Sequence, residues 1–84
     1  MVNVTPTIVS SALKARWEHF LATGLNTNDT ITFADLNSIT TIVGLKTLDG
    51  TALTFTIAGN VATLTTAAQT NINIAGVVWG ATNP

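Results

Sequence analysis

The strongest constraint on the fold of this chain is the alternation in residues 51–66, TALTFTIAGNVATLTT. Large apolar side chains stand at odd positions from 53 to 57, with Thr between them and Ala on either side, which is the period of a strand with one buried face. Gly59-Asn60 then provides a dipeptide suited to a two-residue hairpin turn. That turn fixes the cross-strand pairs Ala58–Val61, Ile57–Ala62, Thr56–Thr63, Phe55–Leu64 and Thr54–Thr65. Apolar residues meet on one face and threonines on the other, so the stretch predicts an antiparallel hairpin. Its buried residues are expected to be Leu53, Phe55, Ile57 and Leu64.

The strand before this hairpin is expected to end at an Asp-Gly turn signal. A three-residue loop over residues 49–51 pairs Leu45 with Phe55, so that two apolar side chains meet. A two-residue loop instead sets Lys46 against Leu53. We therefore favour the longer loop.

Three further segments have the composition of strands. Residues 29–36 alternate Ile and Phe with Thr, and residues 39–48 are rich in β-branched side chains. Residues 71–79 begin as an alternation of Ile with Asn and end in Val77-Val78-Trp79, which is apolar at three successive positions. Successive apolar residues are typical of a strand that is buried on both faces, so the end of this strand is expected to be covered twice.

Residues 10–24, SSALKARWEHFLATG, fit both a helix and a strand. A helix, between a Ser cap and a Gly stop, places on one side Leu13, Trp17, Phe20 and Leu21. A strand directs Lys14, Arg16 and Glu18 to one side, and to the other Leu13, Ala15, Trp17, His19 and Leu21. The strand is favoured because the rest of the chain is β and a sheet needs partner strands.

Together these segments predict a single all-β domain, because 84 residues suffice for one domain only. The expected architecture is a small antiparallel β-sandwich or barrel of six to seven short strands, with residues 10–24 either a strand or one helix. Residues 12–84 are expected to form this β domain. Residues 1–11 are expected to form an extended N-terminal arm or edge strand, which Pro6 interrupts.

The charge content excludes several classes of partner. Asp, Glu, Lys and Arg make up 8% of the chain, against about 25% in an average soluble domain. The three basic residues are too few and too scattered to neutralise a nucleic-acid backbone. No apolar run approaches the roughly 20 residues of a membrane-spanning helix. We expect neither a nucleic-acid nor a membrane partner.

No arrangement of residues predicts catalysis. His19, the single histidine, adjoins Glu18, but neighbours on a strand point to opposite faces. The four carboxylates lie in separate segments, and Asp29 and Asp49 stand at expected turns. There is no Cys, no metal-ligand spacing and no Gly-rich loop before a helix. The chain is therefore expected not to be an enzyme and to have no catalytic, cofactor-binding or metal-binding residues.

Trp17 and Trp79 allow two interpretations. Both stand within apolar alternation, so packing in the core is the favoured one. If they were exposed beside Asn side chains, they would instead form a platform on which a sugar ring can stack.

Polarity in this chain comes from uncharged residues, with 17 Thr and 8 Asn. A face of Thr and Asn forms hydrogen bonds without the cost of desolvating ions, and low net charge promotes association. We expect copies of the chain to assemble as a trimer or dimer. The candidate interaction residues are Val2, Val4, Thr54, Thr56, Thr63, Thr65, Asn71 and Asn73.

The order of motifs along residues 29–80 gives a further indication. TITFADLNSITTI is followed by a strand bearing Lys46, an Asp-Gly turn, the hairpin ALTFTIAGNVATLT and a closing strand that ends in GVVWG. This order resembles small virion structural proteins of tailed bacteriophages. The resemblance implies a capsid decoration (cement) protein on the outer capsid surface of the virion, which binds the major capsid protein or another virion protein as an oligomer and stabilises the capsid. It supplies no catalytic residues. The alternative is a glycan- or receptor-binding β module of a fibre or adhesin.

Overall fold

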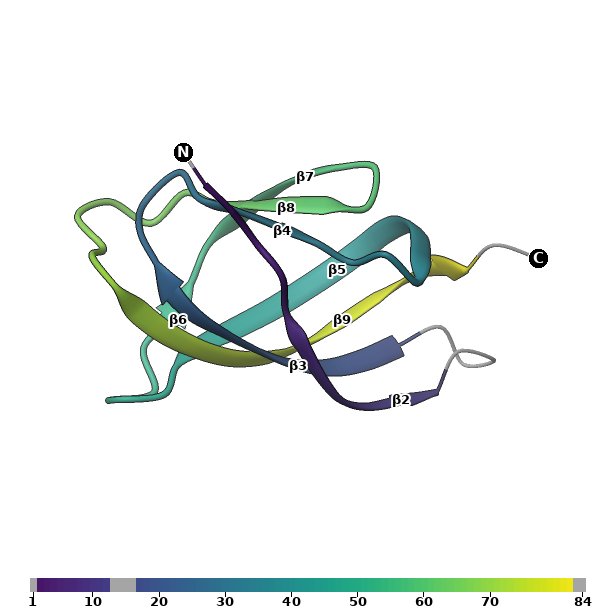
Figure 1. Cartoon of the computed structure of the whole chain (residues 1–84), viewed down its shortest axis with the longest axis horizontal. Helices are drawn as coiled ribbons and strands as arrows, with labels where there is room; N and C mark the ends of the chain where they lie inside the picture. Colours follow the sequence, from purple (N-terminus) through teal and green to yellow (C-terminus); the bar gives the residue numbers. More distant parts are fainter. Residues whose placement is uncertain (1, 13–16, 83–84) are drawn as a thin grey trace.

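The computed structural model describes residues 2–12 and 17–82, and this part of the chain forms nine strands and no helix (Figure 1). The strands are β1 (Asn3–Val4), β2 (Thr7–Ala12), β3 (Trp17–Leu25), β4 (Thr30–Thr32), β5 (Leu36–Lys46), β6 (Ala52–Leu53), β7 (Phe55–Ala58), β8 (Val61–Leu64) and β9 (Ile72–Thr82). One sheet has four strands in the order β1-β4-β8-β7, and the other has five in the order β2-β3-β9-β5-β6. The two sheets pack against each other, so the predicted all-β sandwich is confirmed.

All neighbouring strands are antiparallel except β1 and β4, which run parallel. The number of strands exceeds the six or seven expected because two segments each divide between the sheets. The N-terminal segment supplies β1 to one sheet and β2 to the other, and residues 52–58 supply β6 and β7 in the same way. Residues 3–12 are thus extended and occupy an edge of each sheet.

The predicted hairpin of β7 and β8 is confirmed in its register. Phe55 pairs with Leu64 and Thr56 with Thr63, and Gly59-Asn60 forms the turn between them. Gly59 has a φ of 61°, which glycine adopts without the steric cost that a Cβ adds. The turn is also tied to the connection between the sheets, because the Phe33 N–H donates to the Asn60 carbonyl at 3.0 Å.

The predicted pairing between the central strand and the hairpin is wrong. β5 pairs with β6 so that Gly44 lies opposite Leu53, which matches neither of the two loops considered. The turn is longer than expected, and it is closed by a hydrogen bond from the Gly50 N–H to the Lys46 carbonyl at 2.8 Å. After Leu53 the chain leaves the five-stranded sheet, and Phe55 belongs to the other one. The alternation continues through this crossing, so the pattern alone does not reveal it.

The strand alternative for residues 10–24 is confirmed where the structure describes them, because β2 and β3 include residues 10–12 and 17–24. Residues 13–16 lie outside the described residues. The inner side of β3 carries Glu18 and Phe20, which are buried, while Leu21 on its outer side is exposed. Phe20 decides this orientation because its ring packs edge-on against Phe33, which follows β4 in the connection to β5, with centroids 4.9 Å apart.

The core lies between the two sheets and draws on both of them. Its buried apolar residues are Phe20, Ala22, Leu25, Ile31, Phe33, Leu36, Ile39, Leu53, Ala62, Leu64, Ile74 and Val78. Phe55 is only half-buried but packs against this cluster. The expected burial of Ile57 is wrong, since its side chain is 40% exposed. β7 is an edge strand, so the protein encloses its side chains less completely than those of β8.

Candidate interaction surfaces

The outer side of the four-stranded sheet carries threonine on three neighbouring strands. Thr56 of β7 lies opposite Thr63 of β8, which in turn lies opposite Thr30 of β4. In the next row, the Thr54 and Thr65 hydroxyls are 3.0 Å apart. We call this surface the threonine face; its polar residues are Asn3, Thr30, Thr32, Thr54, Thr56, Thr63 and Thr65, and Val61 and Ala58 continue the row of Thr32 on the same side. None of these side chains is ionisable.

Four of the candidate interaction residues, Thr54, Thr56, Thr63 and Thr65, therefore lie together on one surface. Thr54, Thr56 and Thr65 are exposed and Thr63 is half-buried. Asn3 of β1 extends the surface, because its amide donates to the Thr32 hydroxyl at 2.7 Å. These hydroxyls and amides offer hydrogen bonds to another surface without a charge to desolvate.

The other four candidates lie elsewhere. Val2 is 59% exposed, whereas Val4 is half-buried and packs against the core. Asn71 and Asn73 line a groove of about 590 Å³, together with Lys46, Thr47, Leu48, Thr70 and Ile72. In this groove the Asn73 side-chain oxygen accepts a hydrogen bond from the Gly24 N–H at 3.2 Å. The Asn73 side chain thus ties β9 to β3, and the Asn71 backbone N–H donates to the Asn26 side chain at 2.9 Å; neither asparagine belongs to the threonine face.

The outer side of the five-stranded sheet carries exposed apolar side chains in three consecutive rows. Trp17 of β3 pairs with Trp79 of β9; two residues along, His19 pairs with Val77, and then Leu21 with Ala75. On the other side of β9, β5 adds Thr41, Val43 and Leu45 to the same three rows. We call this surface the apolar face, and its members are Trp17, Leu21, Val43, Leu45, Ala75, Val77 and Trp79.

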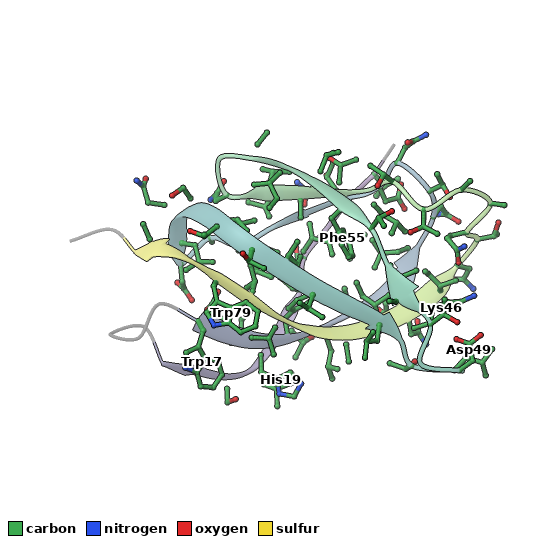
Figure 2. All side chains as sticks on the ribbon, turned by 180° about the vertical axis from the view of Figure 1, so that it is seen from behind. Trp17, His19, Lys46, Asp49, Phe55 and Trp79 are labelled. Atoms are coloured by element: carbon green, nitrogen blue, oxygen red, sulfur yellow. The ribbon has the colours of Figure 1, made fainter. Side chains whose placement is uncertain are left out.

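The exposure of the apolar face is high for such large side chains. Val43 is 47% exposed, Leu45 41% and Trp79 40%. The favoured core position of the two tryptophans is therefore wrong for Trp79, and Trp17 is only half-buried. The expected cover on both sides of the end of β9 is also wrong, because the protein covers only the side of Val78. Figure 2 shows Trp17, Trp79 and His19 gathered at one end of the molecule, with Lys46 and Asp49 at the other.

The sequence did contain a signal for this surface. Val77-Val78-Trp79 indicates a strand buried on both faces, and one sandwich can cover only one of them. Apolar alternation around Trp17 and Trp79 favoured a position in the core, but alternation does not tell which side of a strand the protein covers. Contiguous exposed apolar side chains on a protein mark interaction surfaces, so the apolar face is a further candidate beside the residues chosen from the pattern.

Glu18 is fully buried on the inner side of β3, and this feature was not predicted. With its carboxylate ionised, neither oxygen accepts a hydrogen bond from the described residues. Burial raises the pKa of Glu18 above its usual range, and the negative charge of Asp35 and a hydrogen bond with the Asp35 side chain raise it further. That hydrogen bond requires a proton on one of the two carboxyls. His19 lies on the opposite side of β3, so it cannot share a substrate with Glu18.

Asp29 is also buried but is fully satisfied. Its two carboxylate oxygens accept hydrogen bonds from the Val2 and Asn26 backbone N–H groups, each at 2.9 Å. Those bonds, that of Asn26 foremost, hold the pKa of Asp29 below its usual range. The residue anchors the start of the chain to the loop before β4, which is a structural role.

Within residues 2–12 and 17–82, His, Cys, Asp and Glu side chains nowhere gather in the groups of three that a metal ion needs. Among the same residues there is no helix long and apolar enough to cross a membrane.

Comparison with protein-family models, curated proteins and solved structures finds no match for this chain.

Proposed function

We propose that this chain is a virion structural protein of a tailed bacteriophage, of the capsid decoration type. In this proposal it binds the outer capsid surface as an oligomer, through the major capsid protein or another virion protein, and it does no catalysis. The observation that carries the proposal is the threonine face, on which Thr30, Thr56 and Thr63 form a row across three strands without any ionisable side chain. The motif order over residues 29–80 supports the same assignment.

A face of uncharged hydroxyl and amide groups favours a protein surface as its partner. Hydroxyl and amide groups exchange hydrogen bonds with water for hydrogen bonds with a protein surface at small net cost, whereas buried ions pay a large desolvation penalty. β-branched threonines are also stiff at χ1, so little side-chain entropy is lost when they are covered. A flat uncharged face of this kind suits a repeated protein lattice better than a nucleic acid or a charged small molecule.

The proposal is tested by co-sedimentation of the purified chain with capsids of the phage that encodes it. Thr56→Lys places a charge on the threonine face at an exposed position. Leu48→Lys is the matched control, because Leu48 is 89% exposed in the turn after β5 and belongs to neither outer face. We expect the wild type and Leu48→Lys to bind saturably and Thr56→Lys to bind at least tenfold more weakly. Equal binding by all three proteins would contradict a role for the threonine face, and the absence of wild-type binding would contradict capsid decoration.

A glycan-binding module is the second candidate, and the exposed Trp79 is the observation that favours it. An indole that faces solvent beside a second indole can stack on a sugar ring. The groove that contains Asn71 and Asn73 is lined by Lys46, which lies at the opposite end of the molecule from the tryptophans (Figure 2). These asparagines therefore do not complete the platform. Saturable binding to a glycan array that Trp79→Ala abolishes and Leu48→Lys preserves would favour this candidate over the first.

A further inference from the structure

The end of β9 has an inner side that the protein covers and an outer side that it leaves open. Val78 is fully buried between the sheets, while Trp79 beside it is 40% exposed. Neighbouring positions on β3 and β5 repeat this arrangement, with Phe20 buried next to an exposed Leu21. The residues of β9, the central strand of the larger sheet, suit a sheet that is covered on both sides. One chain covers only its inner side, with the four-stranded sheet.

The open side is regular enough to receive another sheet. Its three rows are Trp17–Trp79–Thr41, His19–Val77–Val43 and Leu21–Ala75–Leu45, which follow the strand pairing across β3, β9 and β5. With strands about 4.8 Å apart and rows about 6.7 Å apart, the face with its flanking edge strands covers roughly 20 Å by 20 Å. Two such faces would bury on the order of 800 Å² together, below the roughly 1,200 Å² of a standard specific interface and in the range of weak, transient contacts.

We infer that the apolar face is the contact between two copies of this chain, which stack their five-stranded sheets face to face around a two-fold axis. In a two-fold contact each residue on the patch meets the same patch of the partner, so any fixed charge would face a like charge. The described residues of the apolar face include no ionisable side chain, and the three rows that contain it add a single one, His19. Two sheets that stack at about 10 Å bury side chains of this size as a sandwich core does.

A second copy fits this face better than the capsid does. Self-association through the apolar face leaves the threonine face of each copy, on the far side of its sandwich, free to bind a shell. The proposed function includes self-association, and the apolar face is the surface inferred for it. The inference rests on the proposed function in this respect only. Because the contact area is small, we expect a reversible dimer that dissociates on dilution.

The experiment measures the mass of the purified chain by sedimentation equilibrium over a wide concentration range, without capsids. Val43→Lys places one added charge on each copy, so two like charges meet in the two-fold contact. Leu45→Thr reduces the apolar area of the contact, and threonine is well accommodated in strands. Thr56→Lys and Leu48→Lys carry the same added charge outside the apolar face and serve as matched controls. Circular dichroism at a concentration where all proteins are monomeric verifies the fold of each variant.

We expect the wild type and both controls to reach the mass of a dimer with one dissociation constant. Val43→Lys should raise that constant more than tenfold, and Leu45→Thr should raise it several-fold while remaining folded. A wild type that stays monomeric at every concentration would overturn the inference. Dimers or trimers that Val43→Lys and Leu45→Thr leave intact would also overturn it, because association would then use the strand edges or the threonine face. Capsid binding by Thr56→Lys is measured separately, so the two proposals fail in different experiments.

Discussion

Trp17 lies directly opposite Trp79 in the pairing of β3 with β9, and both face away from the core of the sandwich. Trp79 is 40% exposed, so an external quencher should reach it in the monomer. In Trp17→Phe, where Trp79 is the remaining tryptophan, we expect emission typical of a solvated indole and strong quenching by acrylamide at low protein concentration. At high concentration the dimer contact should cover the indole and reduce this quenching.

Trp79→Phe provides the comparison, because it leaves only Trp17, which is half-buried. We expect its emission at low concentration to lie at shorter wavelength than that of Trp17→Phe. Shielded, blue-shifted emission from Trp79 in the dilute monomer would show that the indole is in the core and that the apolar face is not open.

Gly44 and Phe55 come from different sheets and make a close contact in the interior. A Cβ added at Gly44 would lie 2.8 Å from Phe55 Cε1 and 3.0 Å from Cζ, which is too close for two carbon atoms. Gly44→Ala should therefore lower the free energy of unfolding by about 1–3 kcal/mol, the usual cost of an overpacked core. Urea denaturation measures this loss. In a Phe55→Leu background the ring is absent, so the same substitution should cost clearly less; an equal cost in both backgrounds would place the strain elsewhere.

Glu18 should make stability depend on pH in the direction of a raised carboxyl pKa. The unfolded chain releases the Glu18 proton in the ordinary range for Glu, while the folded protein retains it to higher pH because the side chain is buried beside Asp35. The stability contribution is therefore complete below the unfolded pKa and is lost as pH rises through the folded one. Glu18→Gln removes this loss, so the variant should gain stability relative to wild type between pH 4 and neutral pH, about where unfolded Glu titrates and above.

Chemical denaturation of both proteins across that pH range tests the effect. Asp35→Asn removes the neighbouring charge, so it should weaken the pH dependence without abolishing it. A difference between wild type and Glu18→Gln that stays constant with pH would show that Glu18 titrates alike in the folded and unfolded chain.

Asp29 should make the stability of the protein depend on pH in the opposite sense to Glu18, with stability lost in acid. Hydrogen bonds from the Asn26 and Val2 backbone lower its pKa, so its contribution is present above the pKa of unfolded Asp and is lost as pH falls through the folded value. Asp29→Ala should be less stable than wild type at neutral pH, and the difference should shrink in acid. Hydrogen exchange supplies a second measurement, because β1 should lose protection in the variant. Unchanged exchange at Thr30, whose N–H donates to the Val2 carbonyl, would contradict an anchoring role for Asp29.

The sequence alone determined the features that depend on near neighbours in the chain. The register of the β7–β8 hairpin follows from the alternation and from Gly59-Asn60, since a two-residue turn leaves one pairing that keeps apolar side chains on a common face. The row of threonines on β7 and β8 follows from the same register. The all-β class follows because most segments show the two-residue period of a strand. Each such strand needs neighbouring strands to pair with its backbone N–H and C=O groups, which an edge leaves unpaired.

Only the tertiary structure decided the features that depend on which sheet a strand joins and which side of it is covered. Residues 52–58 read as one strand, but the chain passes between sheets at Thr54, where the two-residue period continues undisturbed. On β3 both sides carry apolar residues, and the contact of Phe20 with Phe33, distant in sequence, turned Glu18 inward and left Trp17 outward. Local alternation shows which neighbouring side chains share one side of a strand. Whether the protein itself or a partner covers that side is decided by packing between segments that are far apart in the chain.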